Sequence, residues 1–236
     1  MAERVPTEFE IIDLFRGGGH RHAWVQQGIG DDCAVLDLDG DRSLLVTTDL
    51  LIEGVHFLRD TISPWQLGWK AMAVNISDIA AMGGTPRAAF AAAGLTPGVD
   101  VAYLQALRDG MLACARRFGV DLLGGDTSSA PRDAVLCLTL LGTAARDQVV
   151  LRSGAQPDHV AFLGGHVGLS AAGLWLLGEG RERAERVPPE HRQRLLQAHL
   201  EPPPQVELGS WLARRGLASA TMAVSDGVLQ GLGPIC

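Results

Sequence analysis

The sequence predicts a mixed α/β fold, and three features of the 236-residue chain support this prediction. Short apolar runs that suit strands alternate with longer stretches in which apolar residues recur at helical spacing. Glycine is abundant, with 29 residues that gather in short motifs beside aspartate instead of following a regular period. No apolar run reaches the ~18–20 residues that a bilayer-spanning helix needs. We therefore expect an α/β (α+β) protein with no membrane partner.

The first part of the chain is expected to alternate helices with strands. An amphipathic helix is predicted at residues 8–15, and a turn at Asp39-Gly40 separates the two strands that follow it. Ser63 is suited to cap a long helix, because its hydroxyl can accept a hydrogen bond from the first turn and a proline follows it. The other elements predicted here are strands at 34–38, 43–48, 88–95, 120–123 and 134–143, and helices at 65–82 and 100–118.

A polar segment at residues 146–157 ends in a turn, and we place a domain boundary there. This predicts one domain at residues 1–146 and a second at 147–236. The arginine-rich stretch at 181–194 is interleaved with glutamates, so we interpret it as a solvated helix or loop surface. The elements predicted in this part are strands at 159–163 and 220–224, and helices at 169–177 and 205–215.

Charge and cysteine content exclude several classes of protein. The net charge of −7 and the lack of a lysine and arginine stripe argue against a nucleic-acid partner. The four cysteines form no CxxC pair, which argues against a disulfide framework or a zinc site and favours a reducing cytoplasm. The first 15 residues lack a basic region, so we expect no signal peptide.

Four aspartates stand beside turn motifs: the first follows a Gly-Ile-Gly turn, and the other three follow predicted strands directly after threonine, glycine or serine. They are Asp32, Asp49, Asp126 and Asp226. A carboxylate at the carboxyl end of a strand is exposed in the crevice where α/β proteins place ligand sites. A neighbouring glycine lets a phosphate approach the backbone closely. The pattern therefore indicates a site for a phosphate-bearing ligand.

A fifth aspartate lies inside the long predicted helix at residues 65–82. Asn75 and Asp78 are three residues apart, so they share a face of that helix, and their neighbours are almost all apolar. Burying a carboxylate there is unfavourable unless it is paired or binds a metal. Magnesium prefers hard oxygen ligands and shares them with substrate phosphates. Asp78 is therefore a candidate magnesium ligand.

Each of these features also has an ordinary structural explanation. Gly-Asp and Asp-Gly pairs are common turns, and Thr47-Thr48-Asp49 could end a strand in an Asx turn. His56 could be an ordinary surface or core histidine whose ring nitrogens have hydrogen-bond partners. Arg152 could be a solvated loop residue, and Ser225 could cap a helix. The chain has no Walker A sequence, no GxGxxG and no kinase-type HRD. From the residues alone, the prediction stops at a metal–phosphate site.

The residues of six segments, and the order of these segments along the chain, decide between these explanations. They are GIGDDCAVL (28–36), TTDLLIEGVHF (47–57), WKAMAVNISDIAAMGGTPRAA (69–89), LLGGDT (122–127), RSGAQPD (152–158) and VSDG (224–227). Together they closely resemble the thiamine-monophosphate kinases, over residues 8–229. The resemblance implies an aminoimidazole-ribonucleotide-synthetase-like fold that binds ATP in a cleft between two α/β domains. It also implies a homodimer whose N-terminal domains pair their sheets.

The resemblance also implies roles for individual residues. It assigns the magnesium ligands to Asp32, Thr47, Thr48, Asp49, Asp78, Asp126 and Asp226. It assigns ATP contacts to Gly125, Asp126, Arg152 and Ser225, and a contact with the thiamine-phosphate substrate to His56. The implied reaction transfers the γ-phosphoryl group of ATP directly to thiamine monophosphate, which gives thiamine diphosphate. The acceptor is already an anionic oxygen, so positioning and charge neutralisation should suffice without a strong base.

Three departures from the family pattern lie near the end of the sequence. Ala223 stands where the family has a metal-binding aspartate, and Gly231 and Pro234 replace an expected aspartate and histidine. The sequence ends at Cys236, where relatives continue through most of a second domain, so we expect that domain to be incomplete and its segment to be poorly ordered. These departures favour an alternative, a catalytically impaired homologue that still binds nucleotide. Another enzyme of the same superfamily, such as aminoimidazole ribonucleotide synthetase, is a further alternative.

Overall fold

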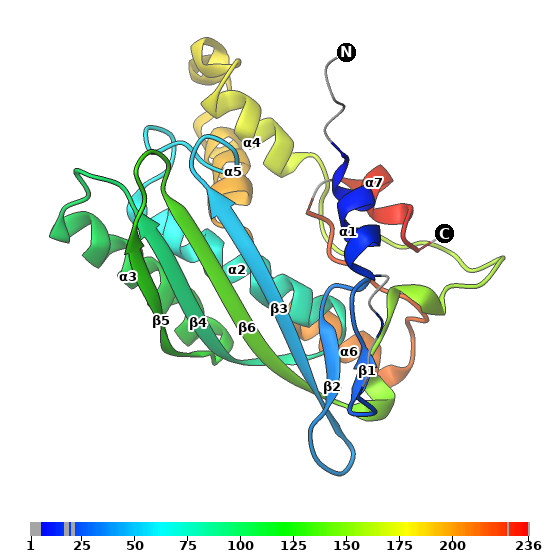
Figure 1. Cartoon of the computed structure of the whole chain (residues 1–236). Coiled ribbons are helices and arrows are strands. Elements are labelled where there is room, and N and C mark those ends of the chain that lie inside the picture. The colour runs from blue at the N-terminus through cyan, green and yellow to red at the C-terminus, as the bar shows by residue number, and fades with distance from the viewer. Residues whose placement is uncertain (1–5, 17–18, 20–21, 226, 236) are drawn as a thin grey trace, which may run out of the picture.

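The computed structural model describes residues 6–16, 19, 22–225 and 227–235, and its centre is one six-stranded sheet (Figure 1). The strands lie in the order β1-β2-β3-β6-β4-β5. All neighbours are antiparallel except β4 and β5. The strand bounds are β1 Val25–Gln27, β2 Ala34–Asp37, β3 Arg42–Ile52, β4 Thr85–Leu95, β5 Asp121–Ser129 and β6 Val135–Ala145. The α/β prediction is thereby confirmed.

Two long helices cover one face of the sheet. They are α2, Pro64–Ala81, and α3, Val101–Phe118, which links the parallel strands β4 and β5. Both begin as predicted, since Ser63 caps α2 in a full capping box and Asp100 accepts a hydrogen bond from the backbone of α3. The helices approach closely, because a Cβ at Gly110 would lie 1.8 Å from the carbonyl oxygen of Trp65. Glycine is therefore required at that crossing.

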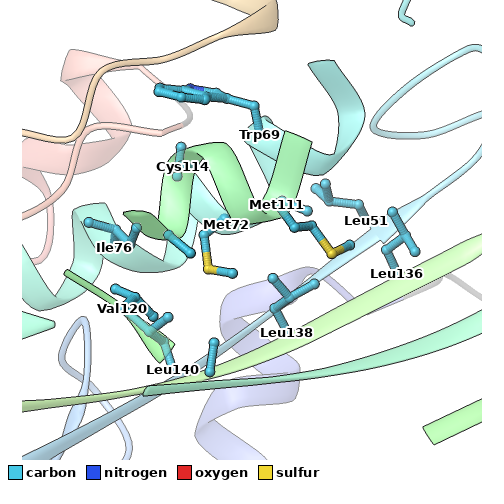
Figure 2. Close-up of a cluster of buried hydrophobic side chains, with 14 of the residues drawn as sticks. Leu51, Trp69, Met72, Ile76, Met111, Cys114, Val120, Leu136, Leu138 and Leu140 are labelled. Carbon is cyan, nitrogen blue, oxygen red and sulfur yellow. The ribbon is translucent and has the colours of Figure 1, made fainter. Parts of the chain in front are cut away.

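The hydrophobic core fills the space between these helices and the sheet (Figure 2). Alternate residues of β6, such as Leu136, Leu138 and Leu140, point toward the helices and are buried. Met72 of α2 and Met111 of α3 meet them from the other side. This alternation fixes the register of the sheet, because a shift by one residue would expose the whole leucine row.

The opposite face of the sheet is open among the described residues. Leu50, Phe90 and Leu123 project from it and are exposed, Leu123 to 62%. Thr48 and Thr139 lie on it as neighbours on β3 and β6, with their hydroxyl oxygens 2.9 Å apart. An apolar sheet face of this kind is a candidate contact surface for another protein chain.

The chain after β6 is helical or irregular in the part that the structure describes. Its helices are α4 Leu169–Leu177, α5 Pro189–Leu200, α6 Val206–Arg215 and the short α7 Val228–Leu232, and α1, Glu8–Arg16, precedes the sheet. α4 packs on α5, and both α5 and α6 contact α2. The contact of α6 is tight, since a Cβ at Gly209 would lie 2.0 Å from the carbonyl oxygen of Ala80. The predicted boundary near residue 146 remains a prediction, although the last strand does end at Ala145.

Two predicted strands were wrong, and one helix was not predicted as a separate element. Residues 159–163 and 220–224 form no strand, because neither segment has a strand beside it among the described residues, and Phe162 is 91% exposed. The helix α5 was missed, because its sequence is charged and buries only Leu200.

No helix in the described parts of the chain is long and apolar enough to cross a membrane.

Candidate metal and phosphate site

The centre of the candidate site lies between β3 and α2. Thr47 and Asp49 alternate on the face of β3 that α2 covers, and the Thr47 hydroxyl donates a hydrogen bond of 2.7 Å to the carboxylate of Asp78. The fully buried Asn75 accepts a hydrogen bond of 3.2 Å from the backbone N–H of Asp49 and donates one of 3.1 Å to the Ala71 carbonyl. Asn75 therefore holds the strand against the helix, and Asp49 and Asp78 face the same space.

The environment of Asp78 disfavours its charge. Burial raises the pKa of Asp78 to about 8, and the negative charges of Asp49 and Asp32 act in the same direction. The hydrogen bond from Thr47 opposes this rise. A carboxyl group with such a pKa is mostly protonated at neutral pH unless a cation approaches. These three carboxylates, Asp32, Asp49 and Asp78, are called the carboxylate cluster below.

A second group of charges joins the loop before β2 to the segment after β6. The Arg152 guanidinium donates a hydrogen bond of 2.7 Å to Asp32, and its backbone N–H donates one of 3.0 Å to the carboxylate of Asp31. The side chains of Asp31 and Asp32 are only 3% exposed. Burial raises the pKa of both carboxyl groups, and Arg152 opposes that rise. Arg152 was predicted to contact ATP, and here it lies against these two aspartates.

Asp31 is a site residue that the sequence analysis missed. Its second carboxylate oxygen accepts a hydrogen bond of 3.0 Å from the backbone N–H of Asp32, so it orients both Asp32 and Arg152. The signal was present in the doubled aspartate of GIGDD, but only one of the two was assigned a role. The Nε of Arg152 is buried and makes no hydrogen bond with the described residues. It therefore keeps one donor that an anionic ligand could use.

Two predicted residues lie away from the carboxylate cluster. Across the sheet, Asp49 lies level with Leu138, Ala91 and Gly125, so three strand spacings, about 14 Å, separate β3 from β5 there. Asp126 is exposed and follows Gly125, and Thr48 points to the open face. The structure therefore does not bring the side chains of Thr48 and Asp126 to Asp78.

Asp49 and Asp126 were predicted to stand at strand ends, but both lie inside their strands. β3 continues to Ile52 and β5 to Ser129, because both strands find pairing partners along this length in β6 and β4. Gly125 has a φ of +155°, and a Cβ there would lie 1.6 Å from the carbonyl oxygen of Ala91. Only glycine fits this backbone conformation. Gly125 therefore has a structural reason to be glycine, besides its predicted contact with ATP.

The remaining predicted residues occupy turns and the segment near the chain end. His56 is exposed, and its Nδ1 accepts a hydrogen bond of 2.9 Å from the Ile52 backbone, which closes the turn after β3. Ser225 is exposed, and Asp226 lies outside the described residues. The backbone N–H of Ala223 donates to the Asp32 carboxylate at 3.4 Å. The segment near residue 223 therefore reaches the carboxylate cluster through its backbone, and the Ala223 side chain brings no carboxylate to it.

The donor chemistry of the cluster fits magnesium. Its side chains offer carboxylate oxygens and the Thr47 hydroxyl, and the mutual repulsion seen at Asp78 is what a divalent cation would relieve. No three histidine, cysteine, aspartate or glutamate side chains within the described ranges are placed to hold a metal ion by themselves. Magnesium usually completes its shell with water and substrate phosphates, so such a protein cage is not required.

The chain is similar to proteins of known family. The family described as AIR synthase related protein, N-terminal domain, matches residues 30–144. The thiamine-monophosphate kinase of Salmonella typhimurium is 39% identical over 89% of this chain and 62% of its own length. That of Bacillus subtilis is 35% identical over 97% of this chain and 69% of its own length. The chain thus spans less than two thirds of the first of these relatives.

Solved structures show the same fold. AaThiL complexed with AMPPCP and TMP superposes with a TM-score of 0.84 and 32% identity, over 97% of this chain and 69% of that one. The thiamine-monophosphate kinase from Stenotrophomonas maltophilia K279a gives a TM-score of 0.74 and 35% identity, over 97% of this chain and 71% of that one. The likeness therefore extends from the sheet into the helices that follow it.

Proposed function

Because this chain belongs to the thiamine-monophosphate kinase family, we propose that it phosphorylates thiamine monophosphate with ATP, giving thiamine diphosphate. The observation that carries the proposal is the pair Asp49 and Asp78, two carboxylates that face one space, where burial and then the charge of Asp49 raise the pKa of Asp78. A relative in the same fold holds AMPPCP and TMP, which supports a nucleotide and a thiamine phosphate as the two substrates. The activity is that of a transferase.

Magnesium is the cation that we propose for the carboxylate cluster. Bound magnesium neutralises charge on phosphate oxygens during phosphoryl transfer. Asp32, Asp49 and Asp78 would hold it, with the hydroxyl of Thr47. We retain as proposed ligands the other residues that the family pattern implies: Thr48, Asp126 and Asp226.

The protein groups would act by positioning the substrates. The Thr47 hydroxyl fixes the carboxylate of Asp78, and Asn75 fixes the backbone of Asp49. Arg152 keeps a free Nε donor near Asp31 for an ATP phosphate. The acceptor phosphate attacks as an anion, so no side chain has to remove a proton. His56 is proposed to contact that phosphate, and Gly125, Asp126 and Ser225 to contact ATP.

Assembly and location are further proposals. The open face of the sheet, with Leu50, Phe90 and Leu123, would pair with the same face of a second copy. Asp126 lies on this side, so its proposed role depends on the dimer. Three free cysteines, which have no disulfide partner among the described residues, support the proposed cytoplasmic location.

One observation favours a second candidate function, a nucleotide-binding homologue with impaired catalysis. The backbone of residue 223 contacts Asp32, and its side chain is the methyl group of alanine, where the family pattern expects a carboxylate. A multi-metal site with one carboxylate fewer could lose several kcal/mol of transition-state stabilisation. Binding of ATP without turnover would be the mark of this alternative.

The purified chain tests both candidates in one experiment. Thiamine diphosphate formation is measured with ATP, thiamine monophosphate and magnesium, and ATP binding is measured separately. We expect turnover that needs magnesium and falls at least about a thousandfold in Asp49→Asn, with Asp60→Asn as an exposed control that keeps full activity. ATP binding with no turnover would support the impaired homologue, and restoring aspartate at position 223 would then test the cause.

A further inference from the structure

Lys70 is the only lysine of the chain, and the other side chains that carry a permanent positive charge are arginines. It lies in α2, is partly buried and contacts α5. Its Nζ lies 3.4 Å from Nε2 of His199 in α5, and Nδ1 of His199 lies 3.0 Å from the hydroxyl of Ser170 in α4. The imidazole of His199 thus links the ammonium group of α2 to the hydroxyl of α4.

No carboxylate of the described chain forms an ion pair with this ammonium group. Arg59 pairs with Glu53 and Arg152 with Asp32, whereas Lys70 contacts the imidazole of His199. Glu201, at the end of α5, accepts a hydrogen bond of 2.9 Å from the amide of Gln66 instead. Burial lowers the pKa of Lys70, and no neighbouring carboxylate opposes the effect. A partly buried cation without a counter-charge is unfavourable in the free protein.

His199 supplies an acceptor and no negative charge. Burial, and then the charge of Lys70, lowers the pKa of His199 to about 4, so its ring is neutral at physiological pH. In the tautomer that suits both contacts, Nδ1–H donates to Ser170 and Nε2 accepts one proton of Lys70. The ring therefore orients the ammonium group and leaves its other two donors for a ligand.

We propose that Lys70, oriented by His199 and Ser170, binds a phosphate group of a substrate. A compact ammonium group suits a phosphate as a point charge. Lys70 precedes Asp78 by eight residues of α2, which places it about 12 Å away along the axis and about 80° around it. The lysine subsite and the carboxylate cluster therefore lie within a quarter turn of each other on one helix. The identity of the substrate rests on the proposed kinase function, and the phosphate belongs either to the acceptor or to the nucleotide.

The single lysine allows a direct test in the whole wild-type chain. Protein grown with ¹³C-lysine gives one side-chain NMR signal, and it is titrated with inorganic phosphate, thiamine monophosphate and ATP. We expect a saturable shift of that signal and a rise in the pKa of Lys70, because a bound anion stabilises the ammonium form. A shift with thiamine monophosphate alone assigns the acceptor, and one with ATP alone assigns the nucleotide. A signal that none of the three ligands moves overturns the proposal.

Two variants separate a ligand contact from a purely structural role. Lys70→Met keeps the apolar stem and should weaken binding of the assigned phosphate ligand at least about tenfold, whereas Lys70→Arg keeps the charge and should weaken it less. Equal affinities of Lys70→Met and wild type for all three ligands would contradict the proposal. If the kinase proposal fails, the titration with inorganic phosphate still decides the role of Lys70. If Lys70→Met does not fold, the wild-type titration decides it.

Discussion

Two groups of buried aspartates lie near each other, and they differ in what balances their charge. Asp31 and Asp32 share the guanidinium and backbone N–H of Arg152. Asp78 forms no ion pair with a described residue. Burial and the charges of Asp49 and Asp32 raise its pKa to about 8, and the Arg152 charge opposes only part of that rise. A carboxylate held in an ion pair joins two segments of the fold, whereas one whose charge is only partly balanced marks a place for a ligand cation. Lys70 is likewise a partly buried charge without an ion-pair partner among the described residues, but its charge is positive.

The group that Arg152 balances should lose stability most when its cation is removed. Arg152→Met leaves two buried carboxylates unpaired, which should lower the free energy of unfolding at pH 7 by about 3–5 kcal/mol. Without Arg152 the pKa of both carboxyl groups rises further, so the deficit should shrink as the pH falls and they become protonated. Urea unfolding at pH 7 and pH 5 measures both effects. A variant as stable as wild type at pH 7 would show that the two groups do not differ in this way.

A change at Asp78, by contrast, should lower activity. Asp78→Asn keeps the size of the side chain and removes one proposed magnesium ligand, so turnover should fall at least about a hundredfold, or ~3 kcal/mol. The magnesium concentration for half-maximal activity should rise as well. Steady-state kinetics over a magnesium series measures both values. Turnover within about threefold of wild type would remove Asp78 from the metal site.

The pH dependence of stability should follow from Asp78 in the metal-free protein. Its pKa is higher in the folded chain than in the unfolded chain, so the folded state binds more protons between pH 4 and 8. This contribution to stability is complete below pH 4 and is lost as the pH rises toward 8, by an amount on the order of a few kcal/mol. Asp78→Asn should remove this slope, and magnesium should restore stability at pH 8 only in wild type. Melting curves with and without chelator report the result.

The smallest effect is expected at Thr47. Thr47→Val removes the hydrogen bond to Asp78 at nearly constant volume, so it should cost about 1 kcal/mol of stability at pH 8. Because that hydrogen bond lowers the pKa of Asp78, its loss should move the pH transition described above upward. Thr48→Val, on the open face, serves as the matched control for stability. An unchanged transition in Thr47→Val would mean that the hydroxyl does not act on Asp78.

Local sequence signals predicted the elements of the first half well. The Ser63 cap with the proline after it, and the helical spacing of apolar residues, located α2 and α3, because these signals act within a few residues. The predicted strands at 159–163 and 220–224 failed for the complementary reason. A strand needs a neighbour to satisfy its backbone, and apolar residues alone do not supply one.

The residues of the aspartate motifs and the order of these motifs determined the family from the sequence alone. The motifs are long, and they follow one another as they do in the family. Only the tertiary structure decided which residues meet: Asp78 faces Asp49, Arg152 is held by Asp31 and Asp32, and Thr48 points to the opposite face of the sheet. Strand alternation turns neighbouring residues to opposite faces, and chain folding brings residues 31 and 152 together. The charge balance of a site depends on these distances in space, which motifs do not encode.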